Sequence, residues 1–250
     1  MKPPRILIVL LVGALLGTSC SKQATRAERP ASSSSTVAPA CPGGVGRSLP
    51  ANARRISRKA GDMDGDGRSD ELIAYAAVDE DEAITGWRIR VLLATNQGID
   101  SSLQKPEQTF PGDIQAYGLA DANGDGKAEG FVLVNAGVSV IFLGALTVSG
   151  CQIDWIHIAH DGRVLLGACG SFGSGFSFDC EHSDSSGRRL LVVREIVLDV
   201  NSYRWKESSY RWLGSTLVPA GTRKGTLPST AAVSARAPFY GIHCGNLPQP

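Results

Sequence analysis

The sequence lacks a strong charge of either sign. Its 25 lysines and arginines nearly balance its 24 aspartates and glutamates, which leaves a formal net charge of +1. A nucleic-acid-binding domain usually carries a basic patch and a high isoelectric point. The balance therefore predicts no nucleic-acid partner, and the basic cluster at residues 54–59 is expected to be a solvated strand edge beside an acidic loop.

Motifs of catalysis are also scarce. The glycine-rich run at residues 170–175 has neither the Gly-x-Ser-x-Gly spacing nor a Walker lysine. His157 and His160 are expected to be ordinary strand histidines. Asp154, Asp161 and Glu195 remain as scattered acidic candidates, and nothing in the sequence selects among them. The sequence favours a protein without catalysis over an enzyme.

The N-terminal apolar run, Ile6 to Gly17, is too short to span a bilayer. It follows Lys2 and Arg5, as in a signal peptide, so residues 1–20 are predicted to direct export. The run ends at Cys20 in Leu-Gly-Thr-Ser-Cys, which resembles a bacterial lipobox, where the cysteine is lipidated. The resemblance implies a lipoprotein anchored to the membrane; secretion after ordinary cleavage is the alternative. Residues 21–50, rich in serine and proline, are predicted to be a disordered tether.

Two acidic loops are the strongest feature of the chain. Residues 62–70 read Asp-Met-Asp-Gly-Asp-Gly-Arg-Ser-Asp, and residues 121–129 read Asp-Ala-Asn-Gly-Asp-Gly-Lys-Ala-Glu. Each has oxygen-bearing side chains at positions 1, 3, 5 and 9 and glycines at positions 4 and 6. Calcium takes six to eight oxygen ligands from carboxylates, amides and backbone carbonyls. The two loops are therefore predicted to bind Ca²⁺.

The ligand sets follow from these positions. In both loops the residue at position 7 is expected to offer its backbone carbonyl, with the Arg68 side chain pointing away. An EF-hand would need a glutamate at position 12, where this chain has Ile73 and Val132. The first loop, with more carboxylates, is expected to bind more tightly. The predicted ligands are Asp62, Asp64, Asp66, Arg68 and Asp70, then Asp121, Asn123, Asp125, Lys127 and Glu129.

The loops belong to a repeat. Their starts lie 59 residues apart, and a third, decayed copy begins 61 residues later, at His182, with Asp184, Ser186 and Leu190 at positions 3, 5 and 9. Apolar and alternating segments follow each loop and predict strands at residues 71–76, 87–94, 130–135, 138–143, 190–193 and 202–206. Residues 51–250 are therefore predicted to be an all-β domain of three antiparallel repeats of roughly 60 residues.

The first loop fully matches the Asp-x-Asp-x-Asp-Gly-x-x-Asp pattern of the FG-GAP or VCBS repeats of integrin-like proteins. The second loop matches the same pattern except at Asn123 and Glu129. The chain resembles this family over roughly residues 54–215. The resemblance implies a small propeller-like array with calcium at the blade edges. A propeller needs more than three blades, so residues 41–60 and 216–250 are a possible fourth unit; an open β stack or a sandwich is the alternative.

Six cysteines in an exported chain predict disulfides. With Cys20 lipidated, five remain. The preferred pairs are Cys169–Cys180, across a local loop, and Cys41–Cys244, between the ends of the domain; Cys151 is an alternative partner within the local bridge.

Taken together, the sequence predicts an exported, membrane-anchored, calcium-stabilised β-repeat protein. Its expected role is non-catalytic binding of a protein or glycan ligand, or scaffolding. The alternative is an extracytoplasmic hydrolase acting on a glycan or cell-wall component, with structural calcium.

Overall fold

The computed structural model describes residues 41, 44–103 and 113–250. The predicted signal peptide, Cys20 and residues 21–40 of the predicted tether lie outside the described residues. Within the described ranges, no helix is long and apolar enough to cross a membrane. The described residues form an all-β fold, as predicted, with one short α-helix, α1 (Val233–Arg236), and one 3-10 turn, η1 (Ala237–Phe239).

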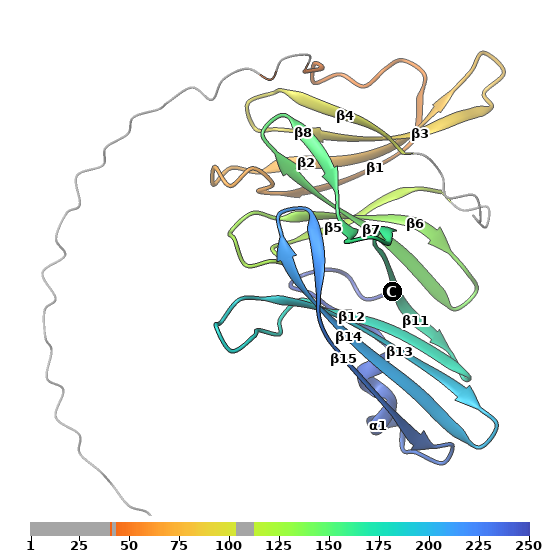
Figure 1. Ribbon diagram of the computed structural model, residues 1–250. Helices are drawn as coiled ribbons and strands as arrows, with labels where there is room; N and C mark the ends of the chain where they lie inside the picture. Colours follow the sequence, from red (N-terminus) through yellow and green to blue (C-terminus); the bar gives the residue numbers. More distant parts are fainter. Residues whose placement is uncertain (1–40, 42–43, 104–112) are drawn as a thin grey trace, which may run out of the picture. The chain divides into compact units, whose positions relative to one another are not determined.

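Three sets of four consecutive strands dominate the structure, and in each set neighbouring strands pair antiparallel (Figure 1). An acidic or decayed loop joins the first two strands of every set. The sets are β1 (Ala53–Gly61), β2 (Asp70–Val78), β3 (Ile84–Leu92) and β4 (Gly98–Leu103); β5 (Gln115–Ala120), β6 (Glu129–Ala136), β7 (Val140–Ser149) and β8 (Gln152–Trp155); β12 (Ser174–Asp179), β13 (Leu190–Asp199), β14 (Ser202–Leu213) and β15 (Thr216–Pro228).

Four further strands extend the second and third sets into one sheet. β11 (Leu165–Ser171) pairs with both β7 and β12, and β16 (Gly241–His243) pairs parallel to β12. β9 (His157–Ile158) pairs parallel to the start of β15 and antiparallel to β10 (Gly162–Arg163). The first set is a separate four-stranded sheet.

The two ends of the described chain do not build a fourth unit. Residues 53–61 form β1, which pairs with β2, and residues 216–228 form β15, which pairs with β14. The possible fourth unit is therefore wrong: strands from both ends are already used in the first and third sets, and the sheets are not closed.

The core fills the spaces between the sets because the central strands are apolar on both faces. On β6, Val132 and Val134 pack with Leu72 and Ile89 of the first sheet. Phe131, on the opposite face of β6, stacks on Phe178 of β12 with ring centroids 5.9 Å apart. Strands buried on both faces read as continuous apolar runs, as β6 does in Phe-Val-Leu-Val.

The disulfides differ from the predicted pairs. Cys41 bonds to Cys151 and Cys180 to Cys244, while Cys169 is free. The Cys169–Cys180 pair is wrong because the β11–β12 hairpin places Cys169 opposite Phe176, so that Cys180 lies four residues further along, about 13 Å away. That separation is too long for a disulfide. β16 instead runs beside β12 and brings Cys244 to Cys180.

Part of the segment predicted as tether contacts the first sheet. Val45 forms an isolated antiparallel bridge with Gly98. The guanidinium of Arg90 donates to the carbonyl oxygen of Ser48 at 2.7 Å and pairs with the Asp100 carboxylate. These contacts hold the chain from residue 45 against β3 and β4.

Candidate metal centre

The first acidic loop connects β1 to β2 and winds around one carboxylate. The Asp62 side chain accepts hydrogen bonds from the backbone N–H of Gly65 at 2.7 Å and of Gly67 at 2.9 Å. Both glycines have positive φ, +82° and +81°, a region that side chains other than glycine seldom adopt. The Gly-x-Gly spacing thus sets the curvature of the loop.

Asp70 anchors the other end of this loop from within the core. Its carboxylate is fully buried and accepts three backbone N–H groups, from Met63 at 2.8 Å, Asp64 at 3.2 Å and Ala94 at 2.8 Å. A buried charge needs such partners. Because Ala94 follows β3, the Asp70 side chain also ties the loop to a third strand of the sheet.

Three carboxylates converge at this point. One oxygen from each of Asp62, Asp64 and Asp70 lies within 4.8 Å of the others, and this is the one such group of metal-ligating side chains in the described part of the chain. Burial raises the pKa of the Asp64 carboxyl, and the charges of Asp70, Asp66 and Asp62 raise it further, against a backbone hydrogen bond from Asp66. A divalent cation would relieve this repulsion.

Asp66 stands apart from that group. Arg68 folds back on it and donates from Nε at 2.8 Å and Nη2 at 2.5 Å to Asp66 Oδ2. Hydrogen bonds from the Arg68 guanidinium and backbone N–H lower the pKa of Asp66. The expectation that the Arg68 side chain points away from the loop is wrong, because the neighbouring exposed carboxylate attracts it. Three of the four predicted carboxylates are brought together, and the fourth is paired with an arginine.

The second acidic loop repeats the backbone of the first between β5 and β6. Asp121 accepts from the N–H groups of Gly124 at 2.7 Å and Gly126 at 3.2 Å, and these glycines have φ of +82° and +88°. Glu129 holds the position that Asp70 has in the first loop, and its side chain lies in the core, 1% exposed. Its Oε2 accepts from the backbone N–H of Ala122 at 2.8 Å.

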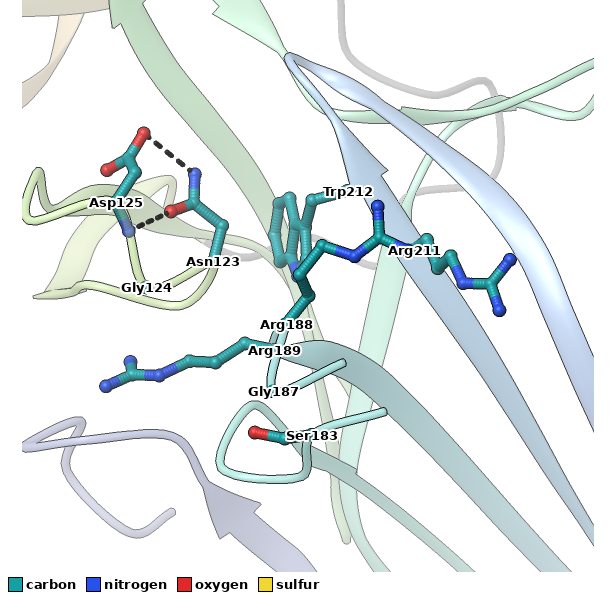
Figure 2. Close-up of a pocket in the computed structure, with 9 residues that line it drawn as sticks. All are labelled: Asn123, Gly124, Asp125, Ser183, Gly187, Arg188, Arg189, Arg211 and Trp212. Carbon is teal, nitrogen blue, oxygen red and sulfur yellow. Dashed lines mark hydrogen bonds between the residues drawn. The ribbon is translucent and has the colours of Figure 1, made fainter. Parts of the chain in front are cut away.

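The donor set of the second loop fits a cation less well. The Asn123 side-chain nitrogen donates to Glu129 Oε1 at 2.8 Å and to Asp125 Oδ2 at 3.2 Å, and Figure 2 shows its bond to Asp125. Asn123 thus turns a donor, not an oxygen, toward the two carboxylates. Burial, joined by the charges of Asp125 and Asp121, raises the pKa of Glu129 to about 8, although backbone N–H groups oppose the shift.

The third loop, residues 182–190 between β12 and β13, has lost most of the acids of the other two loops and has arginines at positions 7 and 8. Asp184 is its one acidic side chain, and it accepts from Ser186 Oγ at 2.5 Å and from the Ser186 N–H at 2.9 Å. The Arg188 and Arg211 guanidinium groups lie 3.5 and 3.4 Å from Asp184 Oδ2. The serine hydrogen bonds, with the Arg188 backbone and charge, lower the pKa of Asp184 to about 2 despite desolvation. Guanidinium groups therefore neutralise this loop.

Successive loops are bonded to one another. The backbone N–H of Ala128, at position 8 of the second loop, donates to the carbonyl oxygen of Asp62 at 2.7 Å. Arg189, at position 8 of the third loop, donates from its guanidinium to the carbonyl oxygen of Asp121. The sequence spacing gives no sign of these contacts, because they join residues 66 and 68 positions apart that only the folded arrangement brings together.

Comparisons with known proteins add no relative. The chain matches no protein-family model, and searches of curated proteins and of solved structures also give no match. The FG-GAP or VCBS resemblance therefore stays a prediction that rests on the loop residues.

Proposed function

We propose that this is a calcium-stabilised β-repeat protein that is exported, anchored to the membrane through Cys20, and acts by binding or scaffolding without catalysis. The observation that carries the calcium assignment is the convergence of Asp62, Asp64 and Asp70 oxygens within 4.8 Å in a glycine-wound loop. Carbonyl groups and water would complete the coordination of an ion held there.

Calcium is the cation we propose because the converging donors are carboxylate oxygens in an irregular loop. Calcium accepts six to eight oxygens in irregular geometry, whereas magnesium demands a near-ideal octahedron and keeps several waters. Two residues of the first loop, Asp62 and Asp70, already hold the backbone through hydrogen bonds. An ion would add cross-links among side chains whose positions the backbone has largely fixed, so its main effect would be on stability.

The finer architecture we propose is an open, propeller-like array of three repeats related to FG-GAP or VCBS modules. Support comes from the matching strand order of the three sets and from the loop that joins the first two strands in each. The glycine φ angles of +81° to +88° in all three loops add to it. Each repeat contributes one face to a core shared with the next, as stacked repeats do.

Export is supported by the N-terminal sequence and by two disulfides, which persist in oxidising compartments. Replacing Cys20 with serine is expected to release the protein from the membrane fraction while leaving it exported. Retention of Cys20→Ser in the membrane pellet after a carbonate wash would argue against the lipid anchor.

Calorimetric titration with Ca²⁺ tests the metal assignment directly. The parent protein is expected to bind with a dissociation constant of about 0.1–1 mM, in the range of extracellular modules. Asp64→Ala should abolish binding at the first loop. Asp81→Ala, which removes an exposed acid from the β2–β3 turn, is the matched control and should bind as the parent does. Equal titrations for all three proteins would remove calcium from the first loop.

A further inference from the structure

A cavity of about 460 Å³ lies between the second and third loops (Figure 2). Its volume is within the range of small-molecule sites. Its walls combine the tip of the second loop with the arginines and one tryptophan of the third set. The lining residues are Asn123, Gly124, Asp125, Ser183, Gly187, Arg188, Arg189, Arg211 and Trp212.

The wall contributed by the third set, with Arg188 on its loop and Arg211 on β14, carries excess positive charge. Arg188 and Arg211 share the single carboxylate of Asp184, at 3.5 and 3.4 Å, and their side chains are 71% and 54% exposed. Figure 2 shows these two side chains reaching one way and Arg189 reaching the other way, toward the second loop. Beyond Asp184, Arg211 makes no other hydrogen bond or ion pair among the described residues, so its terminal N–H groups are available to a ligand.

The chemistry of this wall selects an anion with a flat or ring-shaped body. A guanidinium fork matches the two oxygens of a carboxylate. Trp212, half-buried beside the arginines, presents an aromatic surface of the kind on which a ring can pack. We propose that the cavity binds an acidic sugar, with its carboxylate on Arg188 and Arg211 and its ring against Trp212.

This assignment rests on the binding role proposed above and names its ligand class, and an ion at the second loop would modulate it. Asp125 of the second loop faces the same cavity and opposes an anionic ligand. An ion at that loop would offset its charge, so calcium should strengthen binding. The arginine wall does not depend on calcium, and weaker binding should persist in EGTA.

The test is titration of the parent protein with glucuronate, glucose, N-acetylglutamate and inorganic phosphate. Binding is monitored by calorimetry and by the indole N–H resonances in NMR spectra. Glucuronate should bind and shift the Trp212 resonance, with glucose, N-acetylglutamate and phosphate at least tenfold weaker. Glucose binding equally well would show that the arginines play no part. Equal binding of N-acetylglutamate or phosphate would contradict the sugar assignment, as would the lack of any Trp212 shift.

Arg211→Gln and Arg188→Gln should each weaken glucuronate binding about tenfold or more, as expected for the loss of a hydrogen bond to a charged group. Arg204→Gln is the matched control. Arg204 is an exposed arginine of β14, the strand that carries Arg211, and it pairs with Asp199 at 3.1 Å, outside the cavity. Unchanged binding in both cavity variants would overturn the proposal. Glucuronate binding that is equally strong with and without calcium would still support the cavity site and would count against an ion at the second loop. The two proposals can therefore fail separately.

Discussion

The backbone N–H of Ala128 donates a 2.7 Å hydrogen bond to the carbonyl oxygen of Asp62. This bond joins the second acidic loop to the first residue of the first loop, 66 positions earlier in the chain. The Lys127 side chain lies against Gly65 in the same contact, where an added Cβ would come within 3.0 Å of Lys127 Cγ. An ion that rigidifies the first loop would therefore also rigidify the start of β6.

The contact predicts coupling between the loops in hydrogen exchange. Calcium should slow exchange of the Ala128 amide in the parent protein, because opening that bond requires movement of Asp62. In Asp64→Ala the calcium effect on Ala128 should be smaller than in the parent protein, because only an ion at the second loop could still contribute, and Ala128 is bonded to Asp62 and not to Asp64. Hydrogen exchange followed by NMR or mass spectrometry provides the measurement. Protection of Ala128 that is the same with and without calcium would show that the loops are independent.

The buried Glu129 predicts a pH dependence in the calcium-free protein. Its pKa of about 8 exceeds the ordinary 4.5. Between pH 4.5 and pH 8, therefore, Glu129 keeps its proton in the folded state but has released it in the unfolded state. The contribution of this proton to the free energy of unfolding is therefore fully present below about pH 4.5 and declines as the pH rises toward 8. Glu129→Gln, which mimics the protonated side chain, should flatten this decline. Denaturant unfolding in EGTA at pH 5, 6, 7 and 8 gives the slopes, and identical slopes for both proteins would contradict the assignment.

The Asn123 amide predicts how the second loop can be improved. Asn123→Asp replaces the nitrogen that donates to Glu129 and Asp125 with a carboxylate oxygen. Calcium affinity at the second loop should rise, since ligand charge is one determinant of affinity, while stability in EGTA should fall through repulsion. Asn201→Asp, at an exposed turn, is the control. Weaker calcium binding by Asn123→Asp would show that the ion lies elsewhere.

The two disulfides predict a large loss of stability under reduction. They close loops with sequence separations of 110 and 64 residues. Removing a native disulfide from a small exported domain typically costs about 2–5 kcal/mol. The double substitution Cys180→Ser with Cys244→Ser should therefore lower the denaturant midpoint strongly. Cys169→Ser, which changes the free cysteine, should have a much smaller effect. The same midpoint for both variants would mean that the Cys180–Cys244 bridge is not formed.

Local sequence patterns predicted the strands that follow each loop and the winding of the loops, although residues 87–94 run past β3, which ends at Leu92, and residues 138–143 begin before β7, which starts at Val140. The predicted segments 71–76 and 130–135 fall within β2 and β6, because alternating and apolar runs report burial directly. The glycines at positions 4 and 6 all have the positive φ that their spacing suggests. These features depend on neighbours in sequence, which a single chain displays.

Contacts between distant segments could not be predicted in this way. The Cys180–Cys244 bridge depends on β16 pairing parallel to β12, and a three-residue strand leaves little trace in a sequence. The turn of Arg68 onto Asp66, and of Asn123 toward Glu129, depends on competition among polar groups in three dimensions. The cavity arginines Arg188 and Arg211 were not identified as a site from the sequence, because the third loop shows there only as a decayed copy of the acidic motif.

Stabilisation by calcium can be measured by thermal melting of residues 41–250 with intact disulfides, in calcium, in magnesium and in EGTA. A site of ~0.1 mM affinity in ~1 mM calcium adds ~1.4 kcal/mol, or roughly 3–5 °C for a domain of this size. A calcium site at the first loop predicts a rise of that order in calcium, none in magnesium, and a smaller rise in Asp64→Ala. Identical melting of the parent protein in calcium and EGTA would contradict it and reduce the loops to acidic turns.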